Sequence, residues 1–439
     1  MITDCTLGRL DRPACGDPAA VPPDRGSCGD RGGGRGDARC ACRRCRRGQS
    51  RADHRSARKG GSMKVLHVTP SFYPATFWGG PIFSTKAICD GIAAAPDFSL
   101  RVLTTDAAGP AVRDRLRRVP LPYRVDYTRR IAGHSIAPGL LARLPAAMLW
   151  ADVVHLTGTY SFPTLPVLGL ARALRKPVVW SPRGALQATQ DWPAAPRLRA
   201  KQAFEQAANL LRPAQTILHV TAPIEAAASR ARLPDIQVTV IPNCVTIPPV
   251  TKRPYRPQGA LRLMYLGRLH PKKGVDLLIA AMAALPVHVT LDIYGTGIPA
   301  HEAGLRAAAA GDPRIRFHGD VQASAKARAF GRADLCVLPS HSENFGITVA
   351  EALAHRVPVL TTTDTPWRRL AMMAAGACID PACDDLAEAI LRLGAGDLAA
   401  MGARGRDWMI RDFAPDAMVA GFASLYRSLA TGEPQMVNA

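Results

Sequence analysis

From Met63 onward, short apolar runs alternate with longer segments in which apolar residues recur at helical spacing. Apolar runs bounded by turn residues are typical of strands buried in a parallel sheet, and their alternation with helical segments is typical of an α/β protein. In the first half of the chain, helices are predicted at 81–94, 162–175 and 197–211, and Pro81 suits a first helical turn. Strands are predicted at 64–69, 100–104, 152–156, 177–180, 215–220 and 237–241.

The proline-rich segment 242–257 interrupts this rhythm and predicts a linker, which agrees with a length of 439 residues, too long for one ordinary core. Beyond it, helices are predicted at 275–284 and about 415–430. Strands are predicted at 261–266, 287–293, 314–318, 334–338 and 357–361, with a short last one at 378–379. We therefore predict two doubly wound, Rossmann-like domains facing a cleft. Their expected boundaries are 63–245 and 258–414, followed by a C-terminal helix and tail over 415–439.

Residues 1–62 carry no such pattern and no apolar core of a signal peptide. Cys42 and Cys45 have the spacing of half a zinc site, but no second pair of ligands follows at the required spacing. We expect this segment to be disordered, or to lie upstream of the true start at Met63. It contains more than half of the cysteines, namely Cys5, Cys15, Cys28, Cys40, Cys42 and Cys45.

The formal net charge of +21 raises the question of a nucleic-acid partner. The cations are dispersed along the chain, however, and none of the usual nucleic-acid-binding motifs is present. No apolar run reaches the length of a membrane span. The cysteines after residue 62 are scattered in mostly apolar surroundings, as is typical of reduced cysteines in a cytosolic protein.

The stretch Ser342–Leu353 joins an apolar strand to a helix through a tight loop. Gly346 stands where the helix begins, and the unpaired N–H groups of a first helical turn attract anions. Glu343 in the loop and Glu351 on the helix are carboxylates, which accept hydrogen bonds from vicinal hydroxyls. The stretch suits a phosphorylated sugar ligand. An alternative remains that the two acids only cap the helix.

Three further loops of the second domain follow predicted strands. Gly267–Gly274 places three cations in a turn, and arginine and lysine suit phosphate oxygens. Asp292–Gly297 contains two glycines, and His318–Asp320 ends the next strand. Ligands of doubly wound sheets bind beyond the carboxyl ends of the strands. We therefore expect these loops and Ser342–Leu353 to converge on one site.

These motifs resemble those of glycosyltransferase family 4, the retaining nucleotide-sugar transferases of GT-B fold. The resemblance covers 63–430, and its most specific parts are the acid pair within Ser342–Leu353 and the Gly267–Gly274 turn. Ser181–Gly184 and Thr365–Trp367 also resemble motifs of a bacterial subgroup that builds surface polysaccharides.

The resemblance implies roles for single residues. Arg268 and Lys273 would hold the donor diphosphate and Glu343 the hydroxyls of the transferred sugar, so these three are the expected catalytic residues. Glu351 would hold the ribose. The other residues expected to bind the donor lie in the glycine loop of the first domain, around the base and at the helix start: Gly79, Gly80, Tyr294, Gly295, His318, Ser340, Asn344, Phe345, Gly346 and Ile347.

Two positions depart from the family pattern. Cys244 replaces the glycine of the interdomain Pro-Asn-Gly, where a positive φ is the usual reason for glycine. Arg183 stands where many members carry a histidine, so Arg183 and His155 are the candidates for the acceptor side. For His155, a buried imidazole satisfied by the backbone is an equally acceptable interpretation.

The implied activity is transfer of a sugar from a UDP- or GDP-sugar to a lipid-linked saccharide, with retention. No metal is expected, because no Asp-x-Asp pair is placed to hold one against the diphosphate. Alternatives are an epimerase-like enzyme of the same fold and a non-catalytic subunit that binds nucleotide sugars. We expect a cytoplasmic protein bound peripherally to the anionic inner face of the plasma membrane. The basic clusters expected to bind it are Arg113, Arg115, Arg117 and Arg118, and Arg197, Arg199 and Lys201.

Overall fold

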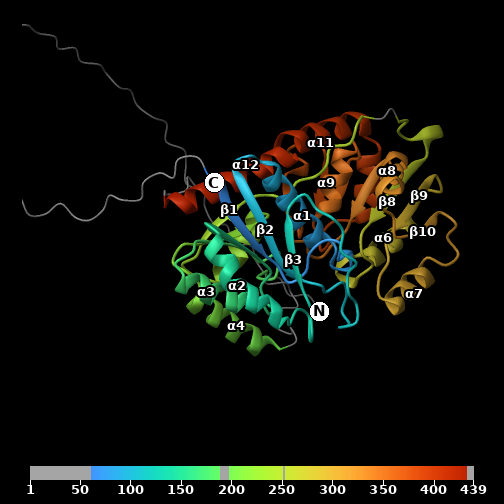
Figure 1. The fold of residues 1–439 in the computed structure, drawn as a ribbon. Helices are drawn as coiled ribbons and strands as arrows, with labels where there is room; N and C mark the ends of the chain where they lie inside the picture. Colours follow the sequence, from blue (N-terminus) through green and yellow to red (C-terminus); the bar gives the residue numbers. More distant parts are fainter. Residues whose placement is uncertain (1–60, 188–196, 251–252, 433–439) are drawn as a thin grey trace, which may run out of the picture. The chain divides into compact units, whose positions relative to one another are not determined.

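The computed structural model describes residues 61–187, 197–250 and 253–432, which belong to one compact unit. The expectations for residues 1–60, including the Cys42–Cys45 pair, lie outside this part of the chain. Two parallel sheets form the fold, as predicted (Figure 1). The first has the strand order β3-β2-β1-β4-β5-β6-β7 and the second β10-β9-β8-β11-β12-β13. In each sheet the order reverses beside the first strand, between β1 and β4 and between β8 and β11, which is where ligands of such sheets bind.

The first sheet and its helices run from Met63 to Val240. The strands are β1 (Met63–Val68), β2 (Phe98–Thr105), β3 (Arg124–Thr128), β4 (Val153–Thr157), β5 (Val178–Ser181), β6 (Thr216–Val220) and β7 (Gln237–Val240). The helices are α1 (Gly80–Ala94), α2 (Pro138–Trp150), α3 (Thr164–Ala173), α4 (Leu198–Leu211) and α5 (Pro223–Arg232). Every strand predicted here is present with slightly shifted ends, whereas β3, α2 and α5 were not predicted.

The second sheet begins at Leu261. Its strands are β8 (Leu261–Leu266), β9 (Val289–Tyr294), β10 (Ile315–Gly319), β11 (Leu335–Leu338), β12 (Val359–Thr362) and β13 (Gly376–Ile379). The helices are α6 (Val275–Ala281), α7 (Pro299–Ala308), α8 (Ala323–Arg332), α9 (Ile347–Ala354), α10 (Leu386–Gly394), α11 (Leu398–Phe413) and α12 (Pro415–Thr431). The four residues of β11 are all buried, as expected for a central strand covered on both faces.

The last helix, α12, returns to the first sheet. It packs against α1, and its buried residues Phe422 and Tyr426 share a core with Val65 of β1 and Ile88 of α1 (Figure 1). The Tyr426 hydroxyl lies 2.6 Å from Nδ1 of His155 on β4. The end of the chain therefore stabilises the beginning.

Two sequence expectations concern the remaining core. The five cysteines after residue 62 are free thiols, and of these Cys89 and Cys336 are fully buried. Cys244 does not have a positive φ, so the hinge here does not need the conformation that favours glycine. Within the described ranges, no helix is both long and apolar enough to cross a membrane.

Candidate functional site

The basic turn after β8 and the acidic loop after β11 lie against each other, because β8 and β11 are neighbours in the sheet. The His341 N–H donates to the Lys272 carbonyl at 2.9 Å. Gly274 has a φ of +62°, and a Cβ there would lie 2.1 Å from the Pro339 carbonyl oxygen. Only glycine allows this approach, which explains the residue that ends the turn. The two motifs therefore lie side by side at the carboxyl end of the sheet.

Lys273 and Glu343 form an ion pair across this contact. Their side chains are 14% and 11% exposed, so the pair is largely shielded from water. Glu343 also accepts a hydrogen bond from Ser340 at 3.1 Å. The Arg268 side chain is exposed and has no hydrogen-bond or ion-pair partner among the described residues. Lys273 and Glu343 thus meet at one end of the sheet, and Arg268 belongs to the same turn as Lys273.

Helix α9 begins beside this pair. Gly346 has left-handed φ and ψ of 73° and 59°, and a Cβ there would lie 3.1 Å from Nε1 of Trp367. Trp367 donates a hydrogen bond to the Phe345 carbonyl, which fixes the peptide just before the helix. The first N–H groups of α9 therefore follow a turn that is held in place by Trp367. Unpaired N–H groups at the start of a helix bind anions.

Glu351 does not stand alone on α9. Lys326 of α8 forms an ion pair with it, and the two side chains are 28% and 22% exposed. The sequence analysis did not assign Lys326 to the site. A ribose hydroxyl bound by Glu351 would share the carboxylate with this ammonium group.

The loops after β9 and β10 complete this side of the site. The rings of Tyr294 and His318 are stacked with centroids 4.6 Å apart, and His318 Nε2 lies 2.6 Å from Asp292. A Cβ at Gly295 would lie 1.8 Å from the Gly267 carbonyl oxygen, so the backbones of these two loops touch. His318, the exposed ring of this pair, lies beside a glycine turn and suits stacking with a nucleobase.

The glycine loop of the first sheet borders open space. Gly79 has φ and ψ of 69° and −138°, a conformation that only glycine adopts readily. A Cβ built at Gly79 or Gly80 would meet no atom within 4 Å. The loop precedes α1, so a ligand could approach the backbone here closely.

The turn after β5 meets the acidic loop of the second sheet. A Cβ at Gly184 would lie 3.0 Å from the Asn344 side chain. Glu225 in the first turn of α5 is fully buried and accepts hydrogen bonds from the Gly184 N–H at 2.7 Å and from the N–H and hydroxyl of Thr221 at 2.8 Å. When the Asn344 amide is oriented to satisfy its neighbours, it also donates to Glu225 at 3.0 to 3.1 Å. Glu225 therefore links motif loops of both sheets.

The sequence analysis did not identify Glu225. Burial raises its pKa, and the hydrogen bonds that it accepts oppose this effect. The only signal in the sequence is an acid in the first turn of a helix that follows a buried strand, which is also the signal of an ordinary cap. Arg183 lies beside Gly184, has a left-handed φ of 56° and donates through Nη1 to Asn243 at 3.0 Å.

His155 lies in the core of the first sheet and is fully buried. Its Nδ1 lies 2.6 Å from the Tyr426 hydroxyl and its Nε2 lies 2.7 Å from the Ser181 hydroxyl. Burial holds its pKa well below the usual value, so it is neutral. With both ring nitrogens engaged, His155 has none left for an acceptor in this structure. The expected partners were backbone groups, whereas the observed ones are side-chain hydroxyls.

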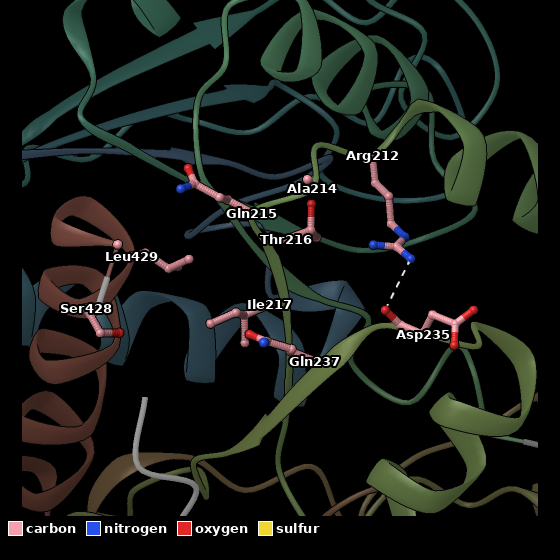
Figure 2. A pocket seen from close by; sticks show the side chains of 10 residues that line it. Arg212, Ala214, Gln215, Thr216, Ile217, Asp235, Gln237, Ser428 and Leu429 are labelled. Atoms are coloured by element: carbon pink, nitrogen blue, oxygen red, sulfur yellow. Dashed lines mark hydrogen bonds between the residues drawn. The ribbon is translucent and has the colours of Figure 1, made fainter. Parts of the chain in front are cut away.

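A pocket of about 420 Å³ lies at the amino-terminal ends of β6 and β7 (Figure 2). The loops of the candidate site follow the other, carboxyl ends of the strands. Thr216 and Gln237, the first residues of β6 and β7, line it together with Leu429 of α12. It contains none of the predicted site residues. The candidate site is therefore defined by the strand-end loops and not by this pocket.

Two family models match the chain. One, described as Glycosyltransferase Family 4, covers residues 79–247, and the other, Glycosyl transferases group 1, covers residues 260–395.

The curated relatives match over shorter stretches. D-inositol 3-phosphate glycosyltransferase of Xylanimonas cellulosilytica is 33% identical over 109 residues, which is 22% of this chain and 25% of that protein. Phosphatidyl-myo-inositol mannosyltransferase of Mycobacterium leprae is 32% identical over 164 residues, 35% of this chain and 43% of that protein. The matches thus span a quarter to less than half of these relatives.

Solved structures match almost the whole described chain. Sucrose-phosphate synthase from Thermosynechococcus elongatus has a TM-score of 0.63 and 21% identity, covering 84% of this chain and 100% of that one. Anabaena HepE in complex with UDP-glucose has a TM-score of 0.63 and 17% identity, covering 83% and 100%. Two doubly wound sheets with these neighbours define the GT-B fold. With both halves matched by glycosyltransferase models, the chain belongs to glycosyltransferase family 4.

Proposed function

We propose that this protein transfers a hexose, with retention, from a nucleotide sugar to a lipid-linked saccharide in bacterial surface polysaccharide assembly. The observation that carries the proposal is the Lys273–Glu343 pair, which joins the basic turn to the acidic loop beside the start of α9. The matched mannosyltransferase and the UDP-glucose complex of HepE support a nucleotide-sugar donor. UDP-sugars are therefore the first donors to test, and GDP-sugars the second.

The parts of the site suit the departure of a nucleoside diphosphate. Negative charge then develops on phosphate oxygens, and Arg268, Lys273 and the N–H groups of α9 can stabilise it electrostatically. Glu343 accepts hydrogen bonds from sugar hydroxyls, while its ion pair holds the Lys273 ammonium in place. These cations supply the charge that a metal would otherwise supply. No carboxylate is an evident nucleophile, so front-side attack assisted by the leaving phosphate is our working mechanism.

A transfer assay tests this function against its two alternatives. The full chain is incubated in EDTA with radiolabelled UDP- and GDP-sugars, with and without a bacterial lipid extract. Label that moves into lipid supports the proposed transferase. Conversion of the sugar nucleotide without lipid would instead identify an epimerase-like enzyme, and binding without any conversion would identify a non-catalytic subunit.

The two carboxylates are expected to act on different parts of the donor. Glu351→Gln should weaken binding of free nucleoside diphosphate, because the ribose is present in donor and product alike. Glu343→Gln should lower kcat for transfer more than it weakens that binding, because its carboxylate is expected to contact the sugar of the donor and reaches the diphosphate only through its ion pair with Lys273. Calorimetric titration and initial rates measure both effects. Glu302→Gln, which removes a surface carboxylate paired with Arg306, is the control. Equal diphosphate affinity in Glu351→Gln and the wild type would remove the ribose role.

We also propose that the first half of the chain binds the cytoplasmic face of the membrane. Phe77, Phe83 and Ile131 are 60%, 45% and 55% exposed. The segment 112–119 carries exposed arginines between the exposed Val112 and Val119. Exposed apolar groups among cations are typical of a peripheral membrane surface, and each cation adds about 1 kcal/mol near anionic lipid.

Flotation with vesicles tests this surface. The protein should float with phosphatidylglycerol vesicles, less so as salt rises, and poorly with phosphatidylcholine. Charge reversal at Arg113 and Arg117 should reduce flotation at least several-fold, whereas Arg392→Glu on α10 should not. Equal binding to anionic and neutral vesicles would contradict the proposal.

A further inference from the structure

Half of the Arg183 guanidinium has no hydrogen-bond partner among the described residues. Nη1 donates to Asn243, but Nε and Nη2 are closed off from water and have no hydrogen-bond acceptor in the described chain. No carboxylate of these residues forms an ion pair with Arg183. Burial lowers the pKa of Arg183 to about 10, and the negative charge of Glu225 opposes this effect only in part. Buried donors without acceptors are rare in native proteins and call for an explanation.

Arg253 also has buried donors without acceptors, and its surroundings explain them. These donors are Nε and Nη2. Its guanidinium, however, lies 4.1 Å from the centre of the Tyr255 ring, and stacking on an aromatic face accounts for it. Arg183 has no ring contact among the described residues. Its two free donors therefore lack the compensation that Arg253 has.

Arg183 is placed where substrates are expected. Its neighbour Gly184 touches Asn344 of the acidic loop. Burial, with a smaller contribution from the charge of Arg183, lowers the pKa values of His67 and His219, which lie near the carboxyl ends of β1 and β6. Arg183 thus lies over the middle of the first sheet and next to the predicted donor loop.

The carboxylate that attracts Arg183 most strongly does not take up its free donors. Glu225 attracts Arg183 electrostatically, but its oxygens already accept from the backbone of Gly184 and from Thr221. The unpaired edge of Arg183 is formed by Nε and Nη2, two parallel N–H groups on one side of a planar cation. This edge matches the two oxygens of a carboxylate or phosphate, which it binds in a bidentate manner.

We infer that the free edge of Arg183 binds a two-oxygen anionic group of a substrate. The inference rests on the proposed function, since it places this group on the nucleotide sugar or on the acceptor. Three sources share the chemistry: the carboxylate of a uronic acid, the donor diphosphate and a phosphate of the lipid-linked acceptor. Because the edge is closed to water as it stands, the surrounding loops must part for the anion to enter.

Binding measurements on the full chain decide the inference and the source of the anion. The probes are UDP, UDP-glucose, UDP-glucuronate and a polyprenyl phosphate in detergent, and the variants are Arg183→Met and Arg183→Lys. Arg183→Met should weaken at least one probe tenfold or more, and Arg183→Lys should recover little of it because lysine lacks the fork. Arg253→Met is the matched control and should change none.

The pattern of losses identifies the group. Weaker binding of UDP-glucuronate alone indicates a sugar carboxylate. Equally weaker binding of all UDP compounds indicates the donor diphosphate. Weaker binding of the polyprenyl phosphate alone indicates a phosphate of the acceptor. Unchanged affinity of Arg183→Met for all four probes overturns the inference.

Two further measurements distinguish a loss of binding from a loss of stability, and distinguish failure of this inference from failure of the proposed function. Arg183→Met should melt at the same or a higher temperature than the wild type, because it removes a buried charge that lacks an acceptor. A lower melting temperature with unchanged affinities would show a structural role and overturn the inference. If the wild type binds no nucleotide, the proposed donor is wrong, and the binding of inorganic diphosphate and glucuronate to wild type and Arg183→Met still decides the role of Arg183.

Discussion

Arg268→Ala is expected to lower kcat/KM for sugar transfer by roughly 30- to 1,000-fold and to leave the melting temperature nearly unchanged. The loss corresponds to about 2–4 kcal/mol, the usual effect of removing one donor to a developing oxyanion. Folding is spared because the Arg268 side chain is exposed and has no partner in the described chain. Initial rates and thermal unfolding of both proteins measure the two effects.

Lys273→Ala should behave differently from Arg268→Ala. Its ammonium is paired with Glu343 in a largely shielded position, so its removal leaves a carboxylate without its partner. We expect a similar loss of turnover together with a lower melting temperature, and Glu343→Gln in the same chain should restore part of the stability. Lys272→Ala, a cation in the same turn, is the control and should be much milder. If Arg268→Ala, the variant of the preceding prediction, transferred sugar at the wild-type rate, Arg268 would not be a ligand of the donor diphosphate.

The buried strands could be predicted from the sequence for a simple physical reason. A parallel strand covered on both faces is nearly all apolar, as in the fully buried β11. Strand β3 lies at the edge of the first sheet, where Arg124 and Asp126 pair with each other near the surface. Its mixed pattern of polar and apolar residues carries no such signal, and it was missed for that reason.

The positions of the site's loops were predictable because these loops follow the ends of buried strands. The residues with which their side chains pair were not predictable. The sequence indicates that Glu351 lies on a helix, yet nothing in it shows that Lys326 of another helix pairs with it. Likewise, the apolar face of α12 could cover either sheet. The structure shows that Tyr426 bonds to His155, far away in the chain. Contacts of this kind depend on tertiary packing that periodicity does not encode.

Glu225 is the clearest example, and its contact with Asn344 leads to the second large expected effect. Each hydrogen bond from these donors to the buried carboxylate contributes about 1.5–3 kcal/mol. Glu225→Gln replaces one acceptor oxygen by an amide group that faces other donors. We expect it to lower kcat/KM about 10- to 100-fold, because the Gly184 turn and the Asn344 loop lose their shared anchor.

Asn344→Asp should cost more, on the order of 3 kcal/mol or above, because it places a second carboxylate against a buried one. In the double variant, which combines Glu225→Gln with Asn344→Asp, the introduced amide can donate to the introduced carboxylate. The contact is then restored with its donor and acceptor exchanged. We expect the double variant to be more active than the product of the single effects predicts, with a coupling of about 1–2 kcal/mol.

A second double-mutant cycle serves as the control. It tests whether replacing any buried acid on a helix of the first sheet would couple to Asn344→Asp. Glu205 on α4 is also a buried acid, but it pairs with Arg232 of α5 and, in the described chain, has no hydrogen bond to Asn344. Glu205→Gln combined with Asn344→Asp should therefore give additive losses in kcat/KM. Additive losses in the Glu225 cycle as well would show that Glu225 only caps α5. Coupling confined to Glu225 would instead show that the two halves of the site are aligned through one buried carboxylate.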